Sequence, residues 1–362
     1  MTRTCFGAVL ALPLLLCAIP AAASEDEKTA DPASDIVAQG RRADEHGPAG
    51  TMADHVHKRG DLMLGLSWMH ESYGGANRAG TEAIGDEAIA AAGYAVKADA
   101  MTMDMAMLHI MWAPNDRVTL MAVPSWMRMG MTMKGLPAAP MGQAGAAKGT
   151  AAMPMMPGQT MSHAVEGIGD TQVGALLVLS RRPRLSVHAG LMVSIPTGKA
   201  DRRNAAGSYV HYMMQGGSGT WDLNPTLTLR GTRAGFGWGA QLGYLFRAEK
   251  ANVSGFRFGD RFTATAWLSK PLGANLSLAG RVQWTGEEEV RGHYNAAHNH
   301  ASPPDRQANY GGQRLDLGLG ANLVVGHGYR IGVEMVVQAW QRLNGIQLPR
   351  QFGANLTRSR LF

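Results

Sequence analysis

Large apolar side chains recur at every second position in the stretch GDLMLGLSWMH, residues 60–70. The apolar side chains occupy the even positions, which are Leu62, Leu64, Leu66 and Trp68. Successive side chains of a β-strand point to opposite faces, so this stretch predicts a strand with one uniformly apolar face.

The same two-faced pattern recurs along the rest of the chain. It predicts twelve strands, in residues 60–70, 101–112, 117–128, 169–180, 184–195, 220–230, 236–247, 261–269, 275–284, 314–325, 329–340 and 351–362. The last strand is the weakest prediction, because Arg358 and Arg360 stand where apolar residues would continue the pattern.

Short and long connections follow one another between these strands. The tight turns are at residues 113–116, 181–183, 231–235, 271–274 and 326–328, and the long connections lie near 71–100, 129–167, 196–219, 248–259 and 285–312. Bacterial outer-membrane barrels show this asymmetry, with an even number of strands and with short turns and both termini in the periplasm. We therefore expect an all-β fold, a transmembrane antiparallel β-barrel of twelve strands in the outer membrane.

A soluble β-sandwich is the alternative fold for such a pattern. Strands of soluble proteins usually have about 5 to 6 residues, whereas these predicted strands are nearly twice as long and carry aromatic residues near their ends. No apolar run of about 18 residues follows the first residues of the chain, so no helical membrane span is expected. The pattern therefore favours the barrel.

The N-terminal region has the features of a cleaved secretory signal. Arg3 precedes an apolar run from Cys5 to Ile19, and three alanines end at Ala23. A lipoprotein signal would need a small residue before Cys17, where Leu16 stands. We expect a signal peptide in residues 1–23, a flexible periplasmic arm or plug in 24–59, and the barrel in 60–362.

Cysteine usage and charge exclude several classes of function. Cys5 and Cys17 lie within the expected signal, so the mature chain would have neither a disulfide scaffold nor a thiolate metal site. The net charge of +6 is spread without basic blocks, so nucleic acid is not an expected partner.

Methionine is concentrated on one face of the second predicted strand, MTMDMAMLHIMW. If the apolar face with Leu108, Ile110 and Trp112 meets lipid, the opposite face points into the lumen. That face consists of Met101, Met103, Met105, Met107, His109 and Met111. Neighbouring strands would add lumenal Met63, Met69, Met121, Met127, His188 and Met192.

Two interpretations of this methionine face remain open. Thioethers are soft ligands that suit Cu(I) or Ag(I), and imidazole accepts Cu(I) or Cu(II), so the face is a candidate metal path. A Met-rich stretch in the expected outer loop after residue 129 would extend it. Methionine is also a pliable apolar side chain, and the same face would then be a lining for apolar solutes.

Two histidine groups are further candidate metal ligands. The stretch DHVHK places His55 and His57 on one face of an extended segment, and HYNAAHNH groups His293, His298 and His300 in an expected outer loop. Such spacing suits Cu(II) or Zn(II), although histidines in surface loops are often only solvated.

Enzyme activity is not expected. The stretch GGSGT, residues 216–220, contains a serine, but it lacks the strand, turn and helix that make a nucleophile elbow.

Several stretches resemble a family of proteobacterial outer-membrane proteins described as transporters and grouped with the phenol meta-cleavage pathway. They are MADHVHKRGDLMLGLSWM, MTMDMAMLHIMWAPNDRVTLMAVPSWMRMGM, EGIGDTQVGALLVL, GLMVSIPTGKAD and GSGTWDLNPTLTLRG. The resemblance implies an outer-membrane barrel with a transporter-like role, and the family's description suggests aromatic compounds. It carries no catalytic residues over to this chain.

The expected function is passage of a small solute across the outer membrane. Soft metal ions and aromatic or other apolar compounds are the competing cargoes, and a non-conducting metal-binding or structural barrel is a third possibility. The expected partners are outer-membrane lipid and the barrel-assembly machinery, which reads an aromatic C-terminal residue such as Phe362.

Overall fold

A computed structural model describes residues 42–137, 155–325 and 328–362. The strands are β1 (Leu62–Tyr73), β2 (Arg78–Gly80), β3 (Glu82–Ala83), β4 (Val96–Asn115), β5 (Val118–Val123), β6 (Ser125–Gly135), β7 (Thr160–Ile168), β8 (Thr171–Arg182), β9 (Leu185–Ile195), β10 (Asp222–Arg233), β11 (Phe236–Arg247), β12 (Phe256–Arg257), β13 (Arg261–Leu272), β14 (Leu276–Glu287), β15 (Arg291–Gly292), β16 (Gly312–Val325), β17 (Tyr329–Gln347) and β18 (Arg350–Leu361). The helical elements are α2 (Asp86–Ala91) and four 3₁₀ turns, Ala43–Glu45, Tyr212–Met214, Pro303–Asp305 and Gln307–Asn309.

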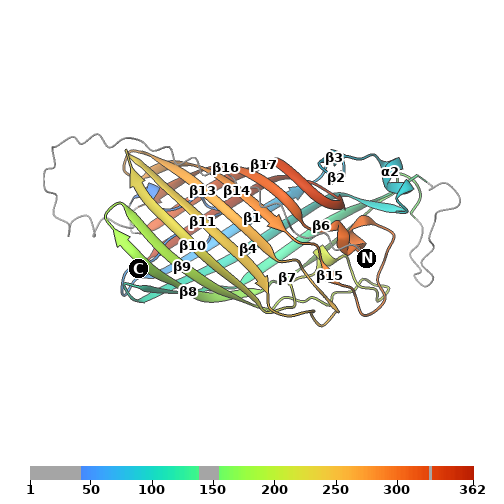
Figure 1. The fold of residues 1–362 in the computed structure, drawn as a ribbon, viewed down its shortest axis with the longest axis horizontal. Helices are drawn as coiled ribbons and strands as arrows, with labels where there is room; N and C mark the ends of the chain where they lie inside the picture. The colour runs from blue at the N-terminus through green and yellow to red at the C-terminus, as the bar shows by residue number, and fades with distance from the viewer. Residues whose placement is uncertain (1–41, 138–154, 326–327) are drawn as a thin grey trace, which may run out of the picture. The chain divides into compact units, whose positions relative to one another are not determined.

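The long strands form one closed antiparallel barrel (Figure 1). Strand β1 pairs with β4 on one side and with β18 on the other, which closes the sheet. Two wall strands are interrupted: β5 continues into β6 after Pro124, and β7 continues into β8 after Gly169 and Asp170. Counted in this way, the described residues form a wall of twelve strands, as the alternation predicts.

The outward face of the wall is apolar. Leu66 is 57% exposed and Leu319 is 70% exposed, although both lie in the middle of long strands. Exposed aromatic side chains lie toward the ends of this surface: Trp112, Phe236 and Phe362 at one end, and Trp68, Trp126, Trp221, Tyr244, Phe246 and Trp340 toward the other. This is the surface that a bilayer requires of a spanning barrel.

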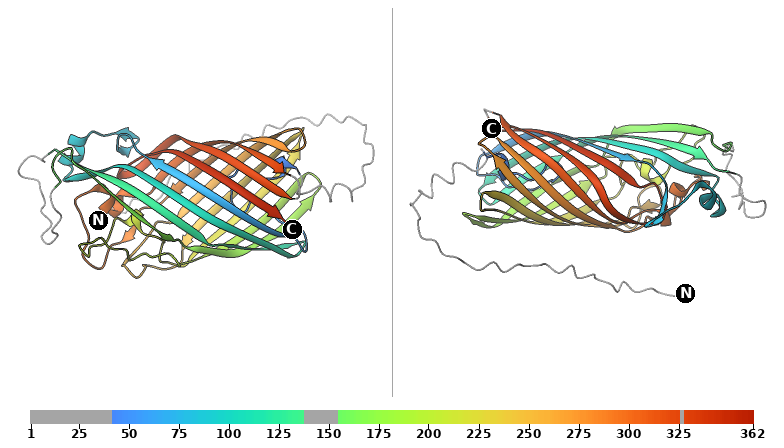
Figure 2. Two further views of the ribbon diagram at one scale, coloured as in Figure 1. Left: turned by 180° about the vertical axis from the view of Figure 1, so that it is seen from behind. Right: turned by 90° about the horizontal axis from the view of Figure 1, so that it is seen from above.

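Tight turns gather at one end of the barrel, which we call the short-turn end. The turn between β10 and β11 has positive φ at both Ala234 and Gly235, as the common two-residue hairpin turn requires. The long connections lie at the other end, which we call the long-loop end, and the two views of Figure 2 show this separation. Within the described residues, no helix is long and apolar enough to cross a membrane.

The last strand is fully paired despite its two arginines. Strand β18 pairs with both β1 and β17. Arg358 and Arg360 point outward at the short-turn end, where both guanidinium groups lie over the ring of Tyr329 and Arg360 also lies over Phe362. At these two positions, where the alternation predicts apolar side chains, the arginines instead make cation–π contacts.

One predicted connection is corrected by the structure. The long connection was expected to begin at residue 129, but residues 129–135 continue strand β6. Strands β6 and β7 extend the wall, and the connection between them is limited to residues 136–159, of which 138–154 lie outside the described residues. The outward face of this extension is polar, with Arg128 opposite both Asp104 and Glu166. The strands thus continue past the apolar belt.

Candidate functional site

The segment before the first strand lies inside the barrel. We call residues 42–60 the plug. The plug enters at the short-turn end, reaches the middle of the lumen near Gly50, and returns to the same end, where Gly60 N donates to Ala113 O. Of the expected arm, residues 24–41 lie outside the described residues.

Polar side chains of the wall hold the backbone of the plug. Hydrogen bonds run from Ser277 to Ala43 O, from Asn322 to Gly47 O, from Gln241 to Met52 O, and between His188 Nε2 and Ala53 O. These partners come from strands on different sides of the ring. The plug is therefore an ordered segment that occupies part of the lumen.

The tip of the plug rests on a buried ion pair. Arg281 donates to both carboxylate oxygens of Glu334, at 2.6 and 3.1 Å, and Gly50 N donates to Glu334 Oε2 at 2.8 Å. Glu334 is 2% exposed, and Asn355 also donates to it. A Cβ atom on Gly50 would lie 2.5 Å from Glu334 Oε2, so a larger residue would force the side chains around the tip to shift.

Histidines and an aspartate gather on the plug near the short-turn end. His55 Nδ1 lies 2.7 Å from Asp54 Oδ1 and 3.3 Å from His46 Nδ1, while His46 Nδ1 lies 3.9 Å from Asp54 Oδ2. The ring of His57 packs against that of His55 at 4.9 Å. Within the described residues, His46, Asp54 and His55 are the one group of three histidine, cysteine or carboxylate side chains spaced to hold a metal ion.

Burial lowers the pKa of two of these imidazoles, His46 and His57. Burial, with a further contribution from Arg330, holds the pKa of His46 well below its ordinary value. Burial and the neighbouring His55 lower the pKa of His57 to about 3. Burial alone would raise the pKa of Asp54, but His55 and His46 outweigh it and the pKa is well below its ordinary value. Asp54 therefore favours its charged form at neutral pH, whereas His46 and His57 favour their neutral forms.

The sequence-predicted methionines lie on the lumenal face. The strand register places Met111 between Met63 and Met121, Met105 between Met69 and Met127, and Met103 beside Met129. Most of them form two packed groups, to which Met69 and Met105 do not belong. The group beside the plug contains Met63, Met111, Met121 and Met192, with Met107 partly buried, and the group toward the long loops contains Met101, Met129, Met131, Met133 and Met214, with Met103 and Met127 partly buried.

The lumenal histidines His109 and His188 have different surroundings. His188 is fully buried and bonds to the plug through Nε2. His109 is 9% exposed, and its Nε2 has no hydrogen-bond partner. His109 and His55 line the same cavity of about 130 Å³, together with Met63, Met111 and Met121. Nitrogen and sulfur atoms thus meet where the plug contacts the methionine face.

The loop histidines gather only in part. The rings of His298 and His300 lie 4.1 Å apart, whereas His293 is exposed on the preceding turn. The sequence indicated one group of three, and the structure brings two of them into ring contact.

Long loops cover the opposite end of the lumen with aromatic side chains. We call the cluster of Tyr209, Tyr212, Phe256, Tyr294 and Tyr310 the aromatic cap. The rings of Tyr212 and Tyr294 stack at 4.4 Å, and His211 and Asp305 pair at 2.7 Å beside them. A cavity of about 170 Å³ lies near the cap, lined in part by Met101, Met131, Met213, Tyr73 and Phe258.

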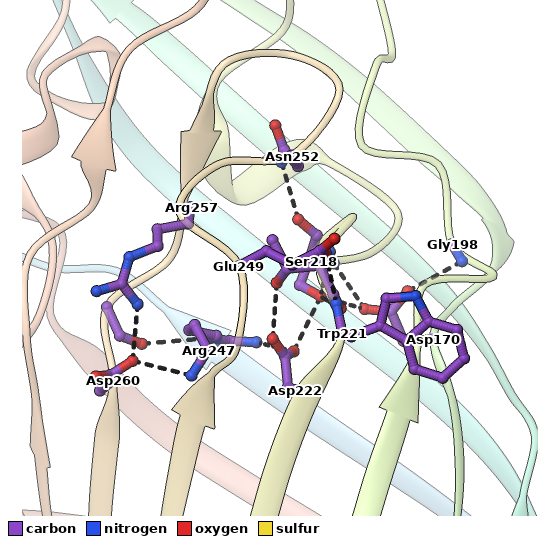
Figure 3. Close-up of polar contacts among 12 residues, drawn as sticks. Asp170, Gly198, Ser218, Trp221, Asp222, Arg247, Glu249, Asn252, Arg257 and Asp260 are labelled. Atoms are coloured by element: carbon purple, nitrogen blue, oxygen red, sulfur yellow. Dashed lines mark hydrogen bonds and ion pairs between the residues drawn. The ribbon is translucent and has the colours of Figure 1, made fainter.

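A polar network fastens these loops to the rim of the barrel (Figure 3). Asp170 accepts hydrogen bonds from Gly198 N and from both the backbone and the hydroxyl of Ser218. Asp222 accepts from Ser218 and pairs with Arg247. Three of the stretches that resemble the transporter family meet here: EGIGD, PTGKAD and GSGTWD. The polar groups named above form hydrogen bonds with one another. Their arrangement supports a structural role.

Two contacts of the site could not be found by reasoning from the sequence. His46 was not singled out because seven residues lie between it and Asp54, and only the folded plug brings the two together. The alternation in the strand predicted at residues 329–340 places Glu334 in the lumen, but its partner Arg281 lies on another strand and no local pattern connects the two. The spacing DHVHK was the one local signal for this site.

Comparisons with known proteins show the fold and the family. A family model described as "Putative MetA-pathway of phenol degradation" matches residues 132–347. An outer membrane channel from Pseudomonas putida F1, known from its crystal structure, is 14% identical with a TM-score of 0.57, and the match covers 86% of this chain and 99% of that chain. This likeness shows a shared fold, an outer-membrane type of barrel.

More distant barrels are similar as well. The transport unit of the autotransporter AIDA-I from Escherichia coli is 7% identical with a TM-score of 0.44, covering 91% of this chain and 97% of that chain. A Pseudomonas aeruginosa FadL homologue is 10% identical with a TM-score of 0.36, covering 87% and 92%. No curated protein matches this chain.

Proposed function

Because the chain belongs to the family described as "Putative MetA-pathway of phenol degradation", we propose that it is an outer-membrane channel for a small solute. The observation that carries this proposal is a closed barrel with an apolar outer face and a lumen occupied by polar contacts to the plug. In this proposal the plug closes the passage, and it is a separate segment that is not one of the wall strands. The short-turn end and both termini face the periplasm in this proposal.

The plug is the closed gate of this channel. Single hydrogen bonds from the wall to backbone atoms of the plug are each worth about 0.5 to 1.5 kcal/mol net. Met52, Ala53 and Val56 of the plug also pack against the lumenal methionines. The ion pair beneath the tip belongs to the wall. The barrel is closed by its own strand pairing. Loss of the plug would therefore leave the wall intact and open the short-turn end.

Deleting residues 42–56 tests the gate. We expect the purified deletion variant to conduct in planar bilayers at a level well above the full chain, while both proteins keep the heat-modifiable gel migration of folded barrels. If neither protein conducts, the barrel is non-conducting and the channel proposal is wrong.

We propose soft metal ions, Cu(I) or Ag(I), as the cargo. Neighbouring strands lie about 4.8 Å apart, and the register sets Met63, Met111 and Met121 side by side on three of them. Sulfurs from different strands can then converge on one ion, and His55 and His109 line the same cavity. Successive sites along the methionine face would pass the ion without trapping it.

Aromatic or other apolar solutes are a second candidate cargo. The cavity near the aromatic cap is large enough for a small ring and is lined by Tyr73, Phe258 and several methionines. The same methionines would then serve as an apolar lining.

The triple variant Met103→Leu, Met105→Leu and Met107→Leu separates the two cargoes. It preserves apolarity and approximate volume but removes three sulfurs. A metal path predicts weaker Ag(I) binding and slower Ag(I) entry into plug-deleted proteoliposomes, with unchanged flux of an aromatic solute such as phenol. Unchanged Ag(I) binding and entry would contradict the metal cargo.

A further inference from the structure

The three groups that meet on the plug are set at the spacing of metal ligands. Ligand atoms bound to one zinc ion at about 2.0 to 2.1 Å, in tetrahedral geometry, lie about 3.3 Å from each other. The observed separations among His46 Nδ1, His55 Nδ1 and the Asp54 carboxylate are 3.3, 2.7 and 3.9 Å. Small side-chain rotations would bring all three atoms to one ion.

The cluster is incompletely satisfied by protein hydrogen bonds. His55 Nδ1 lies close to two potential acceptors, Asp54 Oδ1 and His46 Nδ1, and it can carry at most one proton. His55 Nε2 is buried and has no hydrogen-bond partner, and the same is true of His57 Nε2. The two Nδ1 atoms and the Asp54 carboxylate therefore bring several lone pairs together in a buried place.

The local charge also suits a divalent cation. Asp54 provides the negative charge that a cation needs in a region that also contains Arg230 and Arg330.

We propose that His46, Asp54 and His55 bind a divalent cation of borderline softness, Zn²⁺ or Cu²⁺, and that this ion fastens the plug. Two imidazole nitrogens and one carboxylate suit these ions, whereas Mg²⁺ and Ca²⁺ prefer oxygen ligands. The site shares His55 with the lining of the methionine path, but its ligands are two imidazoles and a carboxylate instead of thioethers, and its ion is divalent. It adds regulation to the proposed channel, but metal binding itself does not depend on whether the barrel conducts.

The position of the ligands explains how an ion would fasten the plug. His46 lies on the inward leg of the plug, and Asp54 and His55 lie on the returning leg. Between them is the tip that contacts Glu334 through Gly50. An ion joining the legs would close this loop and hold the tip in the conformation that docks, as the bond from Gly47 N to Asp54 Oδ2 already does.

Metal binding to the purified full-length protein in detergent is the first test. After treatment with chelator, the protein is titrated with Zn²⁺ by calorimetry and with Cu²⁺ by electron paramagnetic resonance. We expect one equivalent of each ion, with nitrogen coupling in the Cu²⁺ spectrum. His46→Ala and His55→Ala should each weaken binding by at least about tenfold, since loss of an outer partner alone has an effect of that size.

Three controls make the result decisive. His293→Ala changes an exposed loop histidine and should leave binding unchanged. Asp54→Asn preserves the volume of the side chain but removes its charge, so it should weaken binding. Heat-modifiable gel migration shows that each variant is folded. Absence of a one-equivalent site, full binding in folded His46→Ala and His55→Ala, or loss of binding only when His298 and His300 are replaced would each overturn the proposal.

Hydrogen exchange then tests the effect on the plug. Saturating Zn²⁺ should slow exchange of amides in residues 46–55 by at least about tenfold, which corresponds to about 1.4 kcal/mol of added local stability. The same ion should not slow them in His46→Ala. If Zn²⁺ binds but exchange in this segment is unchanged, the ion does not fasten the plug, whether or not the barrel conducts.

Discussion

At the scale of single residues, the tip of the plug depends on the absence of a side chain at Gly50. A Cβ atom there would lie 2.5 Å from Glu334 Oε2 and 2.9 Å from an Arg281 nitrogen. We predict that Gly50→Val costs the docked plug about 1 to 3 kcal/mol through overpacking. Bilayer conductance should rise toward that of the plug-deleted protein.

Gly74→Ala is the matched control, because a Cβ at Gly74 would meet nothing within 4 Å. Conductance of this variant should equal that of the unaltered chain. A closed Gly50→Val channel would show that the tip tolerates a larger residue and that Gly50 is not required for docking.

Glu334 binds the tip of the plug and also forms an ion pair within the wall. Its replacement should therefore change both the conductance and the stability of the barrel. Glu334→Gln removes the charge that pairs with the buried Arg281, and breaking such a pair typically costs about 3 to 5 kcal/mol. We predict a lower temperature for the heat-modifiable gel shift together with a raised conductance. Gly50→Val should change conductance alone, and equal thermal effects of the two variants would contradict this assignment of roles.

At the scale of elements, the aromatic cap stabilises the loops only while its tyrosines are neutral. Burial raises the pKa of Tyr212 to about 12 from an ordinary value of 10. A raised pKa of an acid means that folding favours the protonated form. This stability is therefore complete below pH 10 and is lost as the pH rises from about 10 to about 12.

We predict that the cap loosens in this alkaline range. Tyrosinate absorbance should show some of the eight tyrosines titrating above the rest, and proteolysis of the loops should accelerate as they do. Tyr212→Phe keeps the ring but removes one titrating group, so it should reduce the late fraction. Titration of every tyrosine near pH 10 would refute the prediction.

At the scale of the whole molecule, the apolar belt should respond to charge according to depth. Leu319 lies in the middle of β16 and Leu272 ends β13 at the short-turn end, and both point outward. Arginine at the bilayer midplane of a barrel costs about 2 to 4 kcal/mol, and near the interface about 0 to 1 kcal/mol. We predict that urea unfolding in lipid vesicles will show a far larger loss of unfolding free energy for Leu319→Arg than for Leu272→Arg. Equal losses in the two variants would mean that Leu319 does not lie near the middle of the membrane.

The outward-facing positions and the number of wall strands could be read from the sequence. Side chains of a strand alternate with a period of two, and a lipid-facing wall needs an unbroken apolar face. Leu64 and Leu66 therefore point outward and Met63 inward, as predicted. Even the last strand, weakened by Arg358 and Arg360, follows the alternation.

The tertiary structure alone decided what fills the lumen and where polar strands end. Residues 127–135 form a wall strand because they pair with β4 and β7, although their outward face lacks the apolar pattern. Ring closure brings Arg281 to Glu334 and His188 to Ala53, and folding of the plug brings His46 to Asp54. Local periodicity specifies only which face of a strand a residue occupies. Contacts between distant segments depend on strand register and on how the chain returns through the barrel, which no short stretch of sequence contains.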